Sequence, residues 1–488
     1  MKHSEFICEG SSDQSVCSGL PFYKSYESHR LCILHYPSSS KSLQTFLEAV
    51  DAKFDRDDFN FSGTWFPDEL QWDLKDEEFV NDVDFSDCVF ENEISLQCTF
   101  RKKANFANCE FKSSVDLEGS RFCAEAQFSG SNFDGYLDVS RVEFLSSVKF
   151  DECTFAGSVT FSAGFSGAVE FAGAIFSGEV DFEDSEFRGE VSFYGSRFEQ
   201  RTNFTETKFT HDVSFDFATF CDSVRFGNPT WGGSCFIGES NLSLAHCRID
   251  HPNRFSFHTL TLRPAWFINV DAKNLVFTNV EWNPISIEEN RTELDSPRLL
   301  AITYRQLALN AEENHRYSEA SKFRYLAMDT VRVERGNHRR WNRRWWRKEN
   351  TLRGKLRNLH LIWHGLSIWD LNWWYWVASG YGERLGRAVL GLVSIWLFFS
   401  IVFTFVGFVR WEPKTTTETE AKFATIDAYG APLPLRKALT YSAGVMTLQK
   451  PEPKPATAIA KSSVLLLTVL GPTQAALIAL AIRRRFMR

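Results

Sequence analysis

Three cysteines and one histidine near the N-terminus have the spacing of a metal-ligand set. They follow the pattern C-x8-C-x14-C-x2-H, and the close pair at its end lets two ligands meet one tetrahedral ion. The four residues are Cys8, Cys17, Cys32 and His35. Residues 1–40 hold too few large apolar side chains to build a core, and a bound ion would supply the missing stability. The pattern predicts a structural Zn2+ site, closed by four protein ligands; the alternative is a flexible tail with scattered thiols.

No other group of residues predicts catalysis. The sequence lacks the motifs H-E-x-x-H, G-x-S-x-G, G-x-x-x-x-G-K-[ST] and G-x-G-x-x-G. A net charge of −8 over 488 residues gives no reason to expect nucleic acid as a partner. The sequence therefore predicts a protein that is not an enzyme and whose function depends on its architecture.

A short helix between two long apolar runs could line a pore. Residues 388–409 form an uncharged run of 22 residues and residues 464–482 a run of 19, each long enough to cross ~30 Å of hydrocarbon. Residues 435–448, between them, predict a moderately apolar helix that is too short to cross. Such a helix is allowed at membrane depth only beside protein or a water-filled cavity. The order predicts a re-entrant pore helix; the alternative is a plain two-helix anchor with an extracellular amphipathic helix.

The pore hypothesis assigns roles to individual residues. The predicted lining and outer mouth are Ser442, Thr447, Leu448, Gln449 and Lys450. Lys450 would repel cations there, so a current would favour anions or be unselective. Two spans enclose nothing, so a pore requires an oligomer. The residues predicted to couple the first span to the preceding part are Tyr381, Gly382, Glu383 and Arg384, although a simple helix start explains them nearly as well.

Basic residues flank both apolar runs. From Val331 to Asn358 there are eleven Lys or Arg against two Glu, and the last six residues include four Arg. The positive-inside rule places both chain ends in the cytoplasm and residues 411–457 outside, which predicts a multi-pass protein of the inner membrane. Tryptophans interleave with cations in residues 339–348 and continue through Trp363, Trp369, Trp373, Trp374 and Trp376. This composition is typical of the headgroup region of a bilayer; nucleic-acid binding is the alternative.

Phenylalanines set a fixed period in the N-terminal half. From Phe106 to Phe226 a bulky apolar residue falls alternately five and six residues after the last, so four columns step by 22 with one single-residue slip near Phe165. A fixed period of this kind predicts a solenoid whose coils bury their apolar faces only against neighbouring coils. Small residues lie inward two positions before each Phe, and four of these are cysteines: Cys88, Cys98, Cys109 and Cys153. They predict reduced core thiols in a reducing compartment.

These columns resemble the pentapeptide-repeat family in its phenylalanine-rich variety. The resemblance covers residues 81–288 and implies a right-handed quadrilateral β-helix, a scaffold without chemistry of its own. Residues 379–384, 446–451, 470–472 and 483–486 are similar to those of large bacterial pentapeptide-repeat membrane proteins, a group suggested to be channel-like. Residues 388–488 resemble the two-helix pore module of the potassium-channel superfamily, which implies four copies. That family's Val-Gly-Tyr-Gly filter is missing after Thr447, so potassium selectivity is not implied.

The predicted architecture has six parts. They are a zinc-knuckle-like segment (1–40), a linker and cap (41–80), the β-helix (81–288), a helical hairpin (289–336), a basic Trp-rich interface segment (337–386) and the two-span domain (387–488). The functional hypothesis is a channel-like subunit whose cytoplasmic rod binds or senses a partner. The alternative is a membrane-anchored scaffold that presents the β-helix face to a protein. Mimicry of DNA, as in gyrase-protecting pentapeptide proteins, is disfavoured because the membrane segment would hold the rod away from the chromosome.

Overall fold

The computed structural model describes residues 6–10, 14–17, 19–70, 72–230, 235–238, 240–283, 297–348, 371–409 and 431–486. The chain divides into two compact units, Met1–Glu289 and Asn290–Arg488. The predictions for Trp363 and Trp369, for the basic residues after position 348 and for the loop at 410–430 lie outside the described residues. The side chains of residues 333–348 lie outside them as well.

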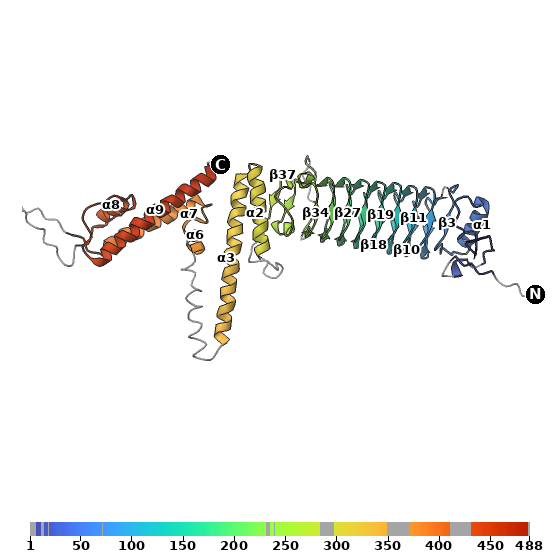
Figure 1. Cartoon of the computed structure of the whole chain (residues 1–488), viewed down its shortest axis with the longest axis horizontal. Coiled ribbons are helices and arrows are strands. Elements are labelled where there is room, and N and C mark those ends of the chain that lie inside the picture. Colours follow the sequence, from blue (N-terminus) through green and yellow to red (C-terminus); the bar gives the residue numbers. More distant parts are fainter. Residues whose placement is uncertain are drawn as a thin grey trace, which may run out of the picture. The chain divides into compact units, whose positions relative to one another are not determined.

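Unit 1 is a solenoid of very short parallel strands, as the phenylalanine period predicts (Figure 1). Four sheets of 8, 9, 10 and 7 strands run along it. Their end strands are β6 (Val83–Asp84) and β33 (Leu242–Ser243), β3 (Trp65–Phe66) and β34 (Arg248–Ile249), β4 (Trp72–Asp73) and β37 (Val276–Thr278), and β5 (Glu78–Phe79) and β29 (Lys208–Phe209). Each strand pairs with those one coil before and after it, so Ala104 faces both Val83 and Ala126. One coil therefore corresponds to one period of the sequence.

The phenylalanine columns form the core of the solenoid. The ring of Phe171 lies 5.1 Å from that of Phe150 and 4.8 Å from that of Phe193, and all three rings are nearly parallel and fully buried. The single-residue slip leaves the ladder intact, because the strand that ends at Phe165 still pairs with the coil before it. Each buried Phe contributes about 2 kcal/mol of hydrophobic stabilisation, so every column stabilises the stacking of neighbouring coils.

The small inward residues also donate hydrogen bonds, a role that the sequence did not predict. The thiols of Cys88, Cys109 and Cys153 are buried and donate to carbonyls of the preceding coil at 3.1, 2.9 and 2.9 Å. The hydroxyls of Ser131 and Ser196 do the same at 2.6 and 2.7 Å. The slot needs a small side chain, since alanine fills it at Ala163, Ala174 and Ala218; where cysteine, serine or threonine fills it, the polar hydrogen is satisfied by a carbonyl of the preceding coil.

The N-terminal end of the solenoid is closed by a helix. Strand pairing begins at β3, earlier than the predicted start at residue 81: Phe66 pairs with Phe90, 24 residues later, and so falls outside the regular step of 22. Helix α1 (Leu43–Phe54) begins after Ser42, whose Oγ accepts from the backbone N–H of Thr45. Its Phe46 ring lies 5.5 Å from that of Phe66, and its Phe54 ring 6.0 Å from that of Phe61. Figure 1 shows α1 at the end of the strand stack.

The segment before α1 contains a 3-10 helix, η1 (Gln14–Cys17), and a hairpin of β1 (Lys24–Tyr26) and β2 (His29–Leu31). At the other end of the solenoid the coils become irregular. A 3-10 turn, η2 (Pro252–Arg254), precedes β35 (Phe255–His258), and a second one, η3 (Pro264–Phe267), lies between β36 (Thr261–Leu262) and β37. The last strand is β38 (Glu281–Trp282). The indole of Trp282 covers the rings of Phe267 and Phe277 at 5.9 and 5.1 Å.

Unit 2 is helical. Its described helices are α2 (Pro297–Glu313), α3 (Tyr317–Lys348), α6 (Leu371–Ser379), α7 (Leu385–Phe403), α8 (Leu435–Met446) and α9 (Ala458–Phe486). Helices α2 and α3 pack as a hairpin, with the ring of Tyr304 6.1 Å from that of Phe323. The turn between them contains His315 in the left-handed region at φ 59°.

Helices α7 and α9 are long and apolar enough to cross a membrane. Only 17% and 22% of their apolar stretches are buried, unlike the core helices of a water-soluble protein. The predicted first run, 388–409, is shortened at its C-terminal end: α7 stops at Phe403, and Phe408 instead pairs with Ala431 and packs on Phe403 and the ring of Tyr441. The end of α7 thus coincides with the packing of Phe408 on Phe403 and Tyr441, a tertiary contact that the run of apolar residues in the sequence does not indicate.

Candidate functional site

The predicted metal ligands converge on one buried point in unit 1. The ligand atoms of Cys8, Cys17, Cys32 and His35 all lie within 4.8 Å of one another, and all four residues are buried. Nδ1 of His35 lies 3.6, 3.0 and 3.2 Å from the Sγ atoms of Cys8, Cys17 and Cys32. The Sγ atoms of Cys17 and Cys32 are 3.5 Å apart. Residues separated by 27 positions in the sequence therefore form a single cluster.

Short local elements place these ligands. Cys17 ends η1, and Cys32 directly follows β2, while a tight turn in which Tyr36 N–H donates to Cys32 O at 3.1 Å brings His35 beside it. Gly10 lies so close to the histidine that a Cβ there would be 2.7 Å from Cβ of His35. A side chain at position 10 would push the imidazole away from the thiols.

A second layer of contacts holds the ligands in place. Nε2 of His35 lies 3.0 Å from the carbonyl oxygen of Ser62, and the backbone N–H of Cys32 donates to Sγ of Cys8 at 3.3 Å. Ser62 belongs to the start of the solenoid, where its hydroxyl accepts from Ser86 in the next coil at 3.0 Å. A ligating histidine usually donates its other ring N–H to a carbonyl in this way, which fixes the tautomer. The cluster is thus tied directly to the first coils.

The electrostatics of the cluster distinguish its ligands, since hydrogen bonds with Cys32 and Cys8 raise the pKa of the Cys17 thiol well above its ordinary value. Burial alone would lower the pKa of His35, but hydrogen bonds with Cys32 and Cys8 raise it to about 10. Hydrogen bonds from Cys17 and Cys32 hold the pKa of the Cys8 thiol far below its ordinary value. These two shifts place a proton on the imidazole of His35 beside the ionised sulfur of Cys8. A metal ion would replace that proton as the positive charge at the centre of the cluster.

The observed spacings fit a tetrahedral ion. Bond lengths of about 2.3 Å to sulfur and about 2.0 Å to nitrogen give tetrahedral edges of roughly 3.5–3.8 Å between ligand atoms. Four of the six separations are 3.0–3.6 Å and all six lie within 4.8 Å, so small shifts of the side chains would bring the ligand atoms to those values. The four residues can therefore hold a metal ion, with no position left open for a substrate.

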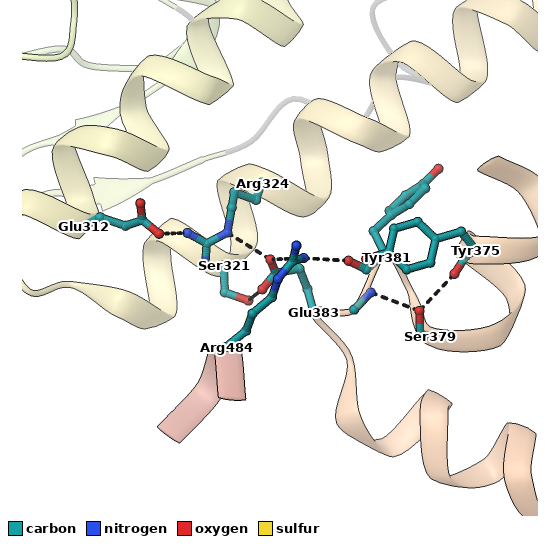
Figure 2. A network of polar contacts seen from close by, with 9 residues as sticks. Glu312, Ser321, Arg324, Tyr375, Ser379, Tyr381, Glu383 and Arg484 are labelled. Atoms are coloured by element: carbon teal, nitrogen blue, oxygen red, sulfur yellow. Dashed lines mark hydrogen bonds and ion pairs between the residues drawn. The ribbon is translucent and has the colours of Figure 1, made fainter. Parts of the chain in front are cut away.

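A second polar site lies in unit 2, where the side chain of Glu383 is only 3% exposed (Figure 2). Its carboxylate accepts from Ser321 Oγ at 2.7 Å, Arg324 Nε at 2.9 Å and Arg484 Nη1 at 3.1 Å. Arg324 also forms an ion pair with Glu312. The predicted coupling residue therefore joins α2, α3 and the C-terminal end of α9 in one network.

The loop before α7 is shaped to place Glu383. Gly380, Tyr381 and Gly382 all have positive φ, at 56°, 61° and 74°. The N–H of Gly382 donates to Ser379 Oγ at 3.0 Å, and Tyr381 O accepts from Arg484 at 2.9 Å. A Cβ at Gly382 would lie 2.9 Å from the hydroxyl of Tyr375, so only glycine fits.

Three of the four predicted coupling residues thus contact α3, α6 or α9 through this loop. Arg384, the fourth, places its guanidinium 4.2 Å from the centroid of Tyr325 on α3. Burial raises the pKa of Tyr381 to about 12, so its hydroxyl stays neutral. The transmission of motion through these contacts remains a prediction.

The residues predicted to line a pore divide into two groups. Ser442 is fully buried, and its Oγ lies 2.6 Å from that of Ser400 on α7, so within one chain it faces a neighbouring helix and not a lumen. Thr447, Leu448, Gln449 and Lys450 are exposed beyond the end of α8. The hydroxyl of Thr447 donates back to Ala443 and Gly444 of its own helix at 3.1 and 3.0 Å.

Comparison with known proteins identifies the solenoid. Residues 96–143, 140–186 and 163–208 match the family model described as pentapeptide repeats (9 copies). This part of the chain is a pentapeptide-repeat domain. The matched residues lie within the coils, so they give no support to the predicted likeness between residues 388–488 and a potassium-channel pore module. No curated protein and no solved structure matches the chain.

Several important residues outside the pentapeptide-repeat coils were missed from sequence. Lys41 is buried beside the metal ligands, and Arg324 and Arg484 surround Glu383. Arg484 belongs to the C-terminal basic run, which indicated membrane topology but not a buried ion pair. The signal for Lys41 was its place six residues after the last predicted ligand, in a segment with few other charged side chains. That signal was too weak to single out one lysine.

Proposed function

We propose that the chain is a membrane-anchored binding scaffold. The pentapeptide-repeat domain, held in the cytoplasm, presents its outer faces to a protein partner, and α7 and α9 cross the bilayer. The observation that carries this proposal is the apolar, mostly exposed surface of both helices on a chain whose other unit has a charged exterior and an interior filled by phenylalanine. Exposing two such apolar helices to water is unfavourable, whereas the hydrocarbon of a bilayer would bury their surfaces.

The scaffold proposal is tested by exchanging the anchor. Residues 371–488 are replaced by an unrelated two-span hairpin of the same orientation, and proteins crosslinked to the domain in cells are identified for both chains. Because binding is assigned to the coils, the set of crosslinked proteins should be the same. A set that changes or disappears with the anchor would contradict the proposal.

A pore is the second candidate, favoured by one observation. Helix α8 has 12 residues, about 18 Å in length, and its Tyr441 and Val445 pack in one cluster with Phe403 of α7 and Leu467 of α9. A half-length helix lodged between two apolar helices is the arrangement of a re-entrant pore element. Thr447 to Lys450 would then face a lumen formed by several copies, four by analogy.

Ion flux through liposomes separates these two functions. The purified full-length protein is reconstituted beside Thr447→Trp, at the exposed end of α8, and Leu435→Trp, at its opposite exposed end. The scaffold proposal predicts no flux above that of empty liposomes. A flux that Thr447→Trp changes and Leu435→Trp leaves alone would establish the pore.

For the metal centre we propose structural Zn2+. Three thiolates and one imidazole are a common zinc set, and all four positions are filled by protein, so no open position exists for catalysis. The ion would lock the N-terminal segment onto the first coils through His35 and Ser62. Metal analysis of the purified protein should give one zinc per chain, and a metal-free protein would refute this.

A further inference from the structure

Lys41 is a buried ammonium beside the metal-ligand loop. Lys41 is 3% exposed, and its Nζ donates to the carbonyl oxygens of Ile33, Leu34 and Tyr36 at 2.7, 3.0 and 3.3 Å. In the part of unit 1 that the structure describes, no carboxylate forms an ion pair with it. Taking a charge out of water without an opposite charge nearby is strongly unfavourable.

Lys53 provides a contrast within the same unit. It is 1% exposed and donates to the carbonyl of Val16 at 3.0 Å, but it also pairs with Asp58 at 2.5 Å. Its charge is therefore balanced by a carboxylate. Lys41 has the same burial and the same kind of carbonyl contacts, and burial lowers its pKa to about 7, so an ammonium at this position needs a negative charge from another group.

The three carbonyls identify that group. They belong to the turn that carries Cys32 and His35, and the electrostatic effect of Cys32, together with that of Cys88, opposes the lowering of the Lys41 pKa by burial. Three thiolates, one neutral imidazole and one divalent ion sum to a net charge of −1. We infer that Lys41 is the counter-ion of an anionic metal centre composed of three thiolates and one divalent ion. This inference rests on the proposed metal site.

The net charge of the centre indicates the charge of the bound ion. A trivalent ion with the same ligands would make the centre neutral, and a monovalent ion would leave it with a charge of −2. One ammonium therefore matches a centre that contains a divalent ion.

The Nζ atom of Lys41 also lies 4.9 Å from the ring centroid of Phe46 on α1. The same ammonium therefore links the metal centre to the helix that closes the solenoid.

The test varies the charge of the centre as well as the lysine. Zn2+ affinity is measured by chelator competition on the detergent-solubilised full chain, for the wild type and Lys41→Met, each with and without Cys8→His, which makes the centre neutral. We expect Lys41→Met to weaken binding roughly tenfold or more in the three-cysteine protein, and to leave it essentially unchanged in the Cys8→His protein. Equal weakening in both would show that Lys41 only holds carbonyls and would overturn the inference, as would no weakening in either.

Controls keep each outcome interpretable. The Co2+ absorption spectrum reports tetrahedral thiolate ligation in every variant, and Cys17→His is a second neutral centre if Cys8→His holds no Co2+. Lys53→Met, which removes a buried lysine that has its own carboxylate, should weaken Zn2+ binding less than Lys41→Met. A wild type that binds neither ion would refute the metal site itself, whereas a wild type and a Lys41→Met variant that bind equally would refute only the role of Lys41.

Discussion

At the scale of single residues, two clusters of charge organise the molecule, and only one was visible in the sequence. The metal ligands were predicted because zinc sets have characteristic spacings that place two ligands on one turn. Glu383 was selected only as part of a loop before the first span. Its partners Arg324 and Arg484 lie 59 and 101 residues away, and no local pattern connects them. Pairs of this kind depend on helix packing.

Replacing Glu383 by Gln tests its place in unit 2. The change leaves two guanidinium groups without their shared carboxylate. Because Arg324 and Arg484 are 21% and 31% exposed, water compensates in part, and we expect a loss of about 1–3 kcal/mol. Thermal unfolding in detergent measures it. Glu319→Gln, which removes a more exposed partner of Arg316, is the matched control and should shift stability by less than about 0.5 kcal/mol. Equal effects would mean that burial of Glu383 is irrelevant.

Removal of the metal ion should loosen the N-terminal end of unit 1. The ligands must be deprotonated to hold an ion, so a strong chelator and a fall in pH both release it. The segment then loses the centre that ties His35 to Ser62, and the melting temperature should drop and recover when Zn2+ is restored. Calorimetry on the full chain measures the shift. A protein that has lost its zinc and melts unchanged would contradict a structural role.

At the scale of elements, periodic patterns were read correctly and interrupted ones were not. The phenylalanine period predicted the coils because each buried ring repeats once per turn of the solenoid. The end of α7 was misplaced because Phe408 leaves the helix to pack on Phe403 and Tyr441. The start of the coils was also misplaced, since Phe66 of β3 pairs with Phe90 at a spacing outside the regular step of 22. Tertiary contacts decided both boundaries.

Two phenylalanines of the coils should differ strongly in how much stability is lost when their rings are removed. Phe171 is fully buried between two stacked rings, so Phe171→Ala should destabilise unit 1 by about 3–5 kcal/mol. Phe217 is 54% exposed at a corner with φ 60°, where the preceding coils have Gly195 and Gly173, and Phe217→Gly should stay within about 1 kcal/mol of the wild type. Denaturant unfolding compares them. A large loss at Phe217 would show that its exposed ring contacts matter to the fold.

At the scale of the whole molecule, the proposed scaffold function depends on the chain being fixed to a membrane. The pentapeptide-repeat domain offers a long charged exterior, while α7 and α9 offer surfaces suited to hydrocarbon. Composition and charge predicted this division, because apolar runs and flanking arginines are local signals. The partner, by contrast, would be recognised by a surface spread over many coils, and a sequence pattern set by the interior does not specify it.

The most direct test of membrane anchoring is a pair of topology reporters. Alkaline phosphatase, which is active only outside the cytoplasm, is inserted between residues 411 and 430 in one chain and fused after Arg488 in another. Two spanning helices with cytoplasmic ends predict activity for the first fusion and none for the second. Inactivity of both fusions in folded, expressed protein would mean that α7 and α9 do not cross the bilayer, and would contradict the membrane-anchored scaffold.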